Sequence, residues 1–162
     1  MSLNGNGSIE LKGTVEEVWS KLMDPSILSK CIMGCKSLEL IGEDKYKADL
    51  QIGIAAVKGK YDAIIEVTDI KPPYHYKLLV NGEGGPGFVN AEGVIDLTPI
   101  NDECTQLTYT YSAEVGGKVA AIGQRMLGGV AKLLISDFFK KIQKEIAKSK
   151  QEASEGHHHH HH

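Results

Sequence analysis

Side chains that could carry acid–base, redox or metal chemistry are few in this sequence of 162 residues. Seven histidines are present, but six of them form the terminal run His157–His162, which has the form of an affinity tag. His75 is the only histidine outside that run, and zinc sites or two-histidine iron sites need more imidazole ligands. We therefore expect neither a bound metal nor a cofactor.

The three cysteines offer no strong reactive site either. Cys31 and Cys35 lie one helical turn apart, which would allow a redox pair, but two thiolates alone make an incomplete zinc site. Cys104 could pair with His75 as thiolate and imidazole, although no third residue is evident to orient that pair. Neither paired carboxylates nor a serine in a nucleophile elbow points to catalysis. We interpret the cysteines as reduced thiols of a cytoplasmic protein that is not an enzyme.

Residues 82–87 read Gly-Glu-Gly-Gly-Pro-Gly and so match the dinucleotide-binding pattern GxGxxG. A dinucleotide site needs a helix that begins inside this motif, whereas strand-like segments lie on both sides of it and Pro86 favours a loop. We predict a hairpin loop instead, with Phe88 as an apolar latch at the mouth of a cavity. Small residues let a backbone approach a partner, and the partner-binding candidates are Gly84, Gly85, Pro86, Gly87 and Arg125.

Charge and length restrict the classes of partner. The chain has a formal net charge of -3 with 17 lysines and one arginine, which argues against dedicated nucleic-acid binding. No run approaches 18 uninterrupted apolar residues, so we expect at most peripheral contact with the inner face of the cytoplasmic membrane. We place a single domain at residues 4–150 and a tail at residues 151–162.

The elements that must position these residues follow from periodicity. Alternation at residues 8–13 predicts a strand, and Thr14 with Glu17 forms a capping box that begins a helix through Leu22. A second short helix follows Asp24-Pro25 and stops at Gly34. From residue 36 to 115 the period is two, which indicates six further strands joined by turns.

The last part of the chain changes to a helical period. Apolar residues recur three or four apart from Val119 to Ile146, which predicts one long amphipathic helix of about 30 residues. Gly116-Gly117 before it could bind an anion at the helix start, but a simple strand-to-helix reversal is favoured. The predicted fold class is α+β: a curved antiparallel sheet of about seven strands wraps the C-terminal helix, with two short helices after the first strand.

Glycines are unusually dense in the predicted long helix. Gly128 and Gly129 cost about 1 kcal/mol each relative to alanine, so space for a ligand or close approach to the sheet should compensate. We predict an apolar cavity under the helix. Its predicted lining residues are Trp19, Tyr61, Phe88, Tyr109, Val119, Ile122, Gly123, Met126, Leu127, Val130 and Leu134.

Several strings are more specific than the order of elements. The sequence resembles the family of the G subunit of carbon monoxide dehydrogenase, within the START-like (polyketide cyclase-like) helix-grip superfamily, at Asp24-Pro25, Cys31–Leu38, Val57–Tyr61, Gly84–Phe88, Val115–Lys118 and Ile122–Arg125. The resemblance implies a non-enzymatic accessory protein of a molybdenum hydroxylase. It also implies a cavity for an apolar ligand, a lipid or a quinone, and help in recruiting the enzyme to the membrane.

Two other functions stay open. One is a pure adaptor with a filled core, which docks on a protein or an anionic membrane through residues 82–88 and the lysine-rich helix. The other is a small-molecule cyclase or hydrolase, for which polar groups would have to converge in the cavity. Tyr46, Tyr61, Tyr109 or Glu114 could supply such groups if they point inward.

Overall fold

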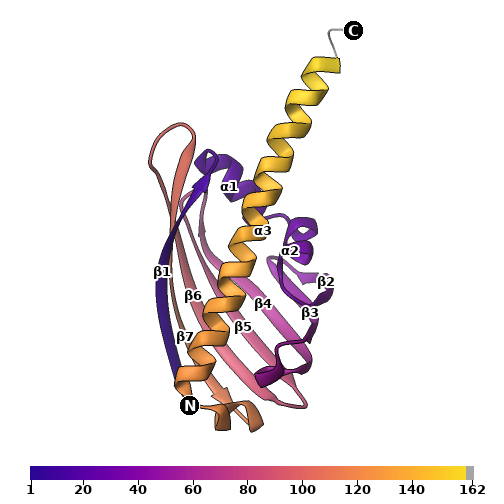
Figure 1. Ribbon diagram of the computed structural model, residues 1–162, viewed down its shortest axis with the longest axis vertical. Coiled ribbons are helices and arrows are strands. Elements are labelled where there is room, and N and C mark those ends of the chain that lie inside the picture. Colours follow the sequence, from indigo (N-terminus) through magenta and orange to yellow (C-terminus); the bar gives the residue numbers. More distant parts are fainter. Residues whose placement is uncertain (160–162) are drawn as a thin grey trace.

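The computed structural model describes residues 1–159, and side chains up to residue 153 (Figure 1). Seven antiparallel strands form one sheet in the order β1-β7-β6-β5-β4-β3-β2. The strands are β1 (Ser2–Lys12), β2 (Cys35–Gly42), β3 (Lys45–Ile52), β4 (Gly59–Lys71), β5 (His75–Gly84), β6 (Gly87–Pro99) and β7 (Cys104–Gly116). The helices are α1 (Val15–Leu22), α2 (Pro25–Cys31) and α3 (Gln124–His159), with 3-10 turns η1 (Ala55–Val57) and η2 (Lys118–Ile122). The predicted fold class is confirmed.

The two short helices begin where their capping residues place them. Thr14 Oγ1 accepts from the Glu17 N–H at 3.1 Å, and Glu17 Oε1 accepts from the Thr14 N–H at 3.4 Å. This reciprocal pair satisfies two donors that the first turn of α1 leaves free. Asp24 caps α2 by accepting from the Ser26 N–H at 2.9 Å. The helices connect β1 and β2, which lie at opposite edges of the sheet.

The first strand is longer than the alternation indicated. It begins at Ser2, and its full length pairs with β7 in a register that joins Ser2 to Glu114 and Lys12 to Cys104. Residues ahead of the predicted domain boundary are therefore part of the sheet. The other strands follow as a meander from β2 to β7, as the spacing of turns predicted.

The prediction of one continuous helix from Val119 is wrong at its start. Lys118–Ile122 forms the 3-10 turn η2, and Gly123 has φ +96, a left-handed conformation that an α-helix cannot contain. The α-helix begins at Gln124, so Val119 and Ile122 lie outside it. The helical spacing of apolar residues runs on across Gly123 because η2 and the first turn of α3 both bury side chains in the smaller cluster at the same end of the sheet.

Two separate apolar clusters hold the fold together. The larger lies beneath the second half of α3 and the short helices, and its buried members are Leu11, Val15, Val18, Leu22, Ile27, Cys31, Tyr76, Ile95, Leu97, Leu107, Phe139, Ile142 and Ile146. The smaller lies where β7 turns into η2, and its buried members are Val115, Val119 and Leu127. The first half of α3 spans the interval between the two clusters.

Candidate ligand-binding groove

The inner face of the sheet carries small side chains between the two clusters. Residues two apart on a strand share a face, so buried Ala63 and Tyr76 mark the face toward α3. Ala48, Ala63 and Gly82 are directly paired across β3, β4 and β5 on this face. Ala91 and Gly93 continue it on β6, opposite Val80 and Leu78. The inner face of the sheet therefore carries little side-chain bulk at these positions.

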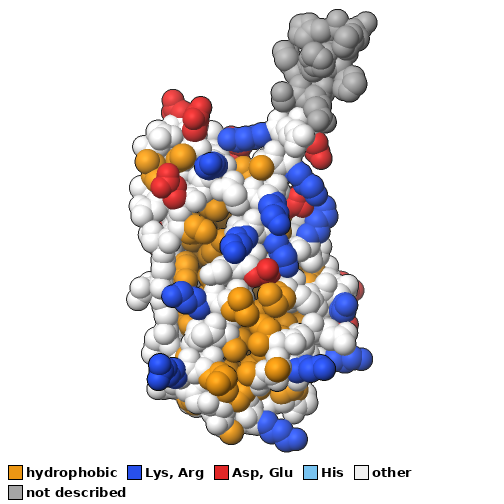
Figure 2. Space-filling view, in the orientation of Figure 1, with side chains coloured by type: hydrophobic (Ala, Val, Ile, Leu, Met, Phe, Trp, Pro, Cys, Tyr) orange, Lys and Arg blue, Asp and Glu red, His pale blue; other side chains and the backbone are white. Residues whose placement is uncertain are grey.

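The first half of α3 stands away from that surface. A Cβ atom added to Gly128 or Gly129 would meet nothing within 4 Å, so close approach to the sheet does not explain these glycines. The helix packs instead against β1, α1 and α2. Val130 and Leu134 remain half-exposed on its groove side. Figure 2 shows the result as apolar side chains in a hollow beside the lower half of α3. We call this space the α3 groove.

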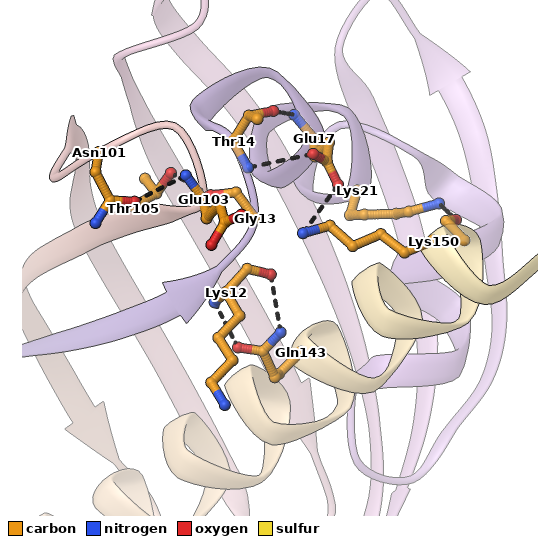
Figure 3. A network of polar contacts seen from close by, with 11 residues as sticks. Lys12, Gly13, Thr14, Glu17, Lys21, Asn101, Glu103, Thr105, Gln143 and Lys150 are labelled. Carbon is orange, nitrogen blue, oxygen red and sulfur yellow. Dashed lines mark hydrogen bonds and ion pairs between the residues drawn. The ribbon is translucent and has the colours of Figure 1, made fainter. Parts of the chain in front are cut away.

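The second half of α3 is fixed by polar contacts (Figure 3). Gln143 Oε1 accepts from the Lys12 N–H at 2.8 Å, and Gln143 Nε2 donates to the Lys12 carbonyl at 3.2 Å. Lys150 Nζ lies 3.9 Å from Glu17 Oε2 of α1. Beside them, Thr105 Oγ1 donates to the Gly13 carbonyl at 2.9 Å and ties β7 to the start of α1. These contacts anchor the second half of α3 to β1 and to α1.

Apart from Phe88, the predicted cavity residues fall into four groups. Tyr61, Tyr109, Val130 and Leu134 lie next to the α3 groove, whereas Leu127 is buried in the smaller cluster. Trp19 belongs to the large cluster, where its ring meets Tyr76 edge-on at 5.5 Å. The smaller cluster includes Val119 and Ile122, and Gly123 joins η2 to α3. Met126 lies on the outside of α3 with 57% of its surface exposed.

The prediction that Phe88 lines or closes the cavity is wrong. Ile95 and Leu97 point inward from β6, so the alternation of the strand turns Phe88 to the outer face. Its ring lies over Gly116 of β7, where an added Cβ would overlap it. Phe88 borders an outer depression of about 510 Å³ together with Asp62 and Asn81.

A second outer depression of about 500 Å³ is lined mainly by polar side chains. Asn4, Asn81, Asn90, Glu92 and Glu114 contribute to it. Both depressions are shallow and lie on the face of the sheet that is turned away from α3. Their chemistry does not suit an apolar ligand, so the α3 groove is the better candidate.

The tyrosines of the inner face are held in position by contacts with glycines, a phenylalanine ring and a backbone carbonyl. Tyr109 and Tyr111 lie across Gly7 and Gly5 of β1, where an added Cβ would overlap each ring. Tyr109 also packs on Phe139 at 5.9 Å. The Tyr61 hydroxyl donates to the Val57 carbonyl at 2.6 Å and so ties η1 to β4. Burial raises the pKa of Tyr61 and of Tyr111, which keeps both phenols neutral.

Glu114 cannot contribute a polar group to the groove. It lies on the outer face, where its Oε1 pairs with the N-terminal ammonium at 2.7 Å and its Oε2 accepts from Ser2 Oγ at 3.0 Å. These contacts lower its pKa. Tyr46 does face inward and is buried. Of the four polar candidates for a cyclase-type site, the three tyrosines therefore point inward and the carboxylate does not.

The glycine hairpin between β5 and β6 is a packed junction. An added Cβ would clash with the Lys60 carbonyl at Gly84 and with the Gly116 carbonyl at Gly87. The Pro86 carbonyl accepts from the Val119 N–H at 2.9 Å, which joins the hairpin to η2. Of the three candidate glycines, Gly85 is the one at which an added Cβ would meet nothing within 4 Å. The predicted hairpin is confirmed, since no helix begins within residues 82–87.

Arg125 lies on the exposed surface of the first turn of α3. The neighbouring Gln124 donates through Nε2 to the Ser2 carbonyl at 2.6 Å, which holds the helix start on β1. Within the part of the chain that the structure describes, Arg125 makes no ion pair. It is available to a partner, but no contact in the structure identifies one.

The predicted reactive groups are separate from the groove. His75 lies on the outer face between Asp96 Oδ1 at 2.7 Å from Nδ1 and Asp69 Oδ2 at 2.9 Å from Nε2. Cys104 interacts with Glu10 rather than with His75, and burial raises the pKa of the Cys104 thiol. All three cysteines are free, and among the side chains that the structure describes, up to residue 153, no three metal-ligand groups form a cluster.

Comparison with known proteins identifies a family. The sequence model of the G subunit of carbon monoxide dehydrogenase (CoxG) matches residues 7–147. A comparison with curated protein sequences gives no match.

Solved structures share the fold at low sequence identity. A START superfamily protein from Mycobacterium smegmatis matches with a TM-score of 0.71 and 14% identity, over 90% of this chain and 97% of that one. An aromatase/cyclase from Streptomyces matches with a TM-score of 0.68 and 14% identity, over 91% and 95%. Norcoclaurine synthase from Thalictrum flavum, in complex with dopamine and hydroxybenzaldehyde, gives 0.66 and 14%, over 91% and 88%. At such identities the likeness shows the fold alone.

Proposed function

Because the chain belongs to the CoxG family of carbon monoxide dehydrogenase, we propose that it is a non-enzymatic accessory protein of a molybdenum hydroxylase. It binds an apolar ligand, a lipid or a quinone, in the α3 groove and helps to recruit the enzyme to the membrane. The partner-binding residues are Arg125 and the exposed tip of the glycine hairpin at Gly85.

The observation that carries this proposal is the position of α3, whose first half stands away from a surface of small residues. A Cβ added at Gly128 would meet nothing within 4 Å, and the apolar side chains of Val130 and Leu134 are only partly buried. Leaving such surface in water costs roughly 25 cal/mol per Å², so an apolar ligand that covers it is favoured. Apart from Thr105, which donates to the Gly13 carbonyl, the hydroxyls on the inner face of the described strands belong to tyrosines, which suits binding better than acid–base catalysis at neutral pH.

The test is a comparison of native and denaturing mass spectra of the freshly purified chain. We expect a discrete extra mass that is lost on denaturation, and its identity separates a lipid from a quinone. Val80→Trp would fill the groove from β5 and should abolish the extra mass. The matched control is Asn81→Trp, which places the same side chain on the outer face and should leave the extra mass unchanged.

Identical native and denaturing masses would count against a tightly held ligand and in favour of the pure adaptor. Turnover of an added polyketide or amine substrate would instead indicate that the chain is an enzyme. Two of the similar structures are named as enzymes, a synthase and an aromatase/cyclase. Pull-down with a purified molybdenum hydroxylase then tests the partner. Arg125→Ala should weaken capture, whereas Lys47→Ala on the outer face should not.

A further inference from the structure

One side of α3 changes from apolar to charged along its length. Val130 and Leu134 lie next to the α3 groove, and Asp137 and Lys141 follow them at spacings of three and four residues. Such spacings keep side chains on the same side of a helix. All four residues are partly buried, whereas Lys140, which points to another side, is exposed. The groove side of α3 therefore continues into an ion pair that begins one turn beyond Leu134.

The charged part of this side is turned toward α2, which lies beside α3 (Figure 1). Cys31, the last residue of α2, is fully buried. Burial and then the charge of Glu145 raise the pKa of the Cys31 thiol, and the charges of Lys141 and Asp137 also act on it. Because charge effects weaken with distance, Asp137 and Lys141 lie close to the junction of the two helices. The ion pair thus stands where the groove side of α3 meets α2.

Asp137 has a buried oxygen that lacks a hydrogen-bond donor. Its Oδ2 atom lies 2.8 Å from Lys141 Nζ, but the angles of this contact do not fit a hydrogen bond, so the oxygen has no donor among the described residues. Buried polar atoms are nearly always hydrogen-bonded in folded proteins, and an exception indicates a bound group. Lys141 carries three N–H donors and is 38% exposed, so it has donors left for a second acceptor.

We propose that Asp137 and Lys141 bind the polar head of the ligand whose apolar tail occupies the α3 groove, and that they select a neutral head over a charged one. Asp137 Oδ2 accepts from a hydroxyl, and Lys141 Nζ donates to an oxygen of the same head. The ion pair is neutral as a whole, so it does not offset the cost of taking a charged head out of water. This assignment rests on the proposed function, because it concerns the ligand of the α3 groove.

Three probes that share one tail test the selection. They are oleyl alcohol, oleate and oleylamine, whose heads at neutral pH are a hydroxyl, a carboxylate and an ammonium. The full chain, freed of ligand by extraction and refolded, is mixed with equimolar pairs of probes, and native mass spectra give the ratio of the two complexes. We expect oleyl alcohol to exceed each charged probe by about tenfold. Val80→Trp fills the groove and should abolish the binding of all three.

Variants of the ion pair should change the preferred head in opposite directions. Asp137→Asn keeps the shape of the side chain and leaves the Lys141 ammonium unbalanced, so the ratio of bound oleate to oleyl alcohol should rise by about tenfold. Lys141→Met leaves the carboxylate unbalanced and should raise the ratio of oleylamine to oleyl alcohol by a similar factor.

Each variant has a matched control with the same change in charge. Lys140→Met alters the next residue, on the exposed side of α3, and Asp62→Asn alters an exposed carboxylate on the outer face of the sheet. Both should keep the ratios of the original chain within about twofold, because solvent and salt screen exposed charges. Circular dichroism confirms that each variant is folded.

The outcomes separate the head assignment from the groove. A preference of the original chain for a charged probe, ratios that stay constant in Asp137→Asn and Lys141→Met, or equal changes in the controls would overturn the head assignment. If Val80→Trp still abolishes binding in those cases, the groove remains the ligand site. Binding of no probe, or binding that Val80→Trp leaves unchanged, would count against the groove and against the head assignment together.

Discussion

At the scale of single residues, His75 gives the clearest dependence on pH. Hydrogen bonds to Asp96 and then to Asp69 raise its pKa, because both ring nitrogens donate to carboxylates when the imidazole is charged. The stabilising effect is complete below the ordinary histidine pKa and is lost as pH rises through the raised value. Asp69 has the opposite pH dependence. Because its pKa is lowered, the stability that it contributes is lost only as pH falls through that lowered value.

We therefore expect stability to fall as pH rises from about 6.5 through the raised pKa of His75, and His75→Gln should remove this dependence. Urea unfolding of both chains across pH 5.5–8.5 measures the difference, and subtraction isolates the histidine from other titrating groups. Parallel curves for the two chains would show that the bridge contributes nothing.

Residue-level predictions from the sequence succeeded where one local interaction decided the outcome. The capping box at Thr14 and Glu17 formed because its two hydrogen bonds involve residues three apart. The orientation of Phe88 was missed because Phe88 and Val89 are both apolar and follow a glycine-rich hairpin. A shift of one residue there reverses every side chain between the two faces. Only the register that pairs Phe88 with Gly116 determines the face.

At the scale of elements, α1 depends on its first turn. Thr14→Ala removes the acceptor for the Glu17 N–H and should lower the free energy of unfolding by about 1 kcal/mol. Ser20→Ala, in the exposed part of the same helix, serves as the control and should change it by less than about 0.5 kcal/mol. Equal effects in thermal or urea unfolding would contradict a specific capping contribution.

Alanine should have opposite effects on stability at the two glycines of α3, Gly128 and Gly129, and at Gly123, which precedes the helix. Gly128→Ala and Gly129→Ala meet no atom within 4 Å, so each should stabilise the chain by up to about 1 kcal/mol through helix propensity. Gly123→Ala should destabilise it by about 1 kcal/mol or more, because φ +96 strains any residue with a Cβ. Urea unfolding measures all three. Destabilisation at residue 128 would contradict the open space beside it, and destabilisation at residue 129 would contradict its exposure to solvent.

The order and type of elements could be predicted because hydrophobic period changes from two to about 3.6 residues at clear turn signals. The break at Gly123 could not, since apolar residues keep helical spacing through η2 while serving a different cluster. A cavity under the helix was predicted from two sources, the glycines of the helix and the family resemblance. Sequence could not separate open space from close packing at Gly128 and Gly129, because that depends on where the second half of α3 is anchored.

At the scale of the whole molecule, a ligand in the α3 groove should bridge the two apolar clusters and add to the stability of the fold. A ligand that binds only the folded chain stabilises it by about 2.7 kcal/mol at a free concentration one hundred times its Kd. The chain refolded from denaturant after extraction with organic solvent should therefore have a lower Tm than the freshly purified chain. Adding back the extracted material should restore the difference.

Val80→Trp is the decisive comparison for this effect. Its groove is already filled, so extraction should leave its Tm unchanged, whereas Asn81→Trp should behave like the original chain. A loss of Tm on refolding that persists after adding back the extract, or that appears equally in Val80→Trp, would point to imperfect refolding. Restoration in the original chain and in Asn81→Trp, but not in Val80→Trp, would place the ligand between α3 and the sheet, because Val80 faces α3 and Asn81 faces outward.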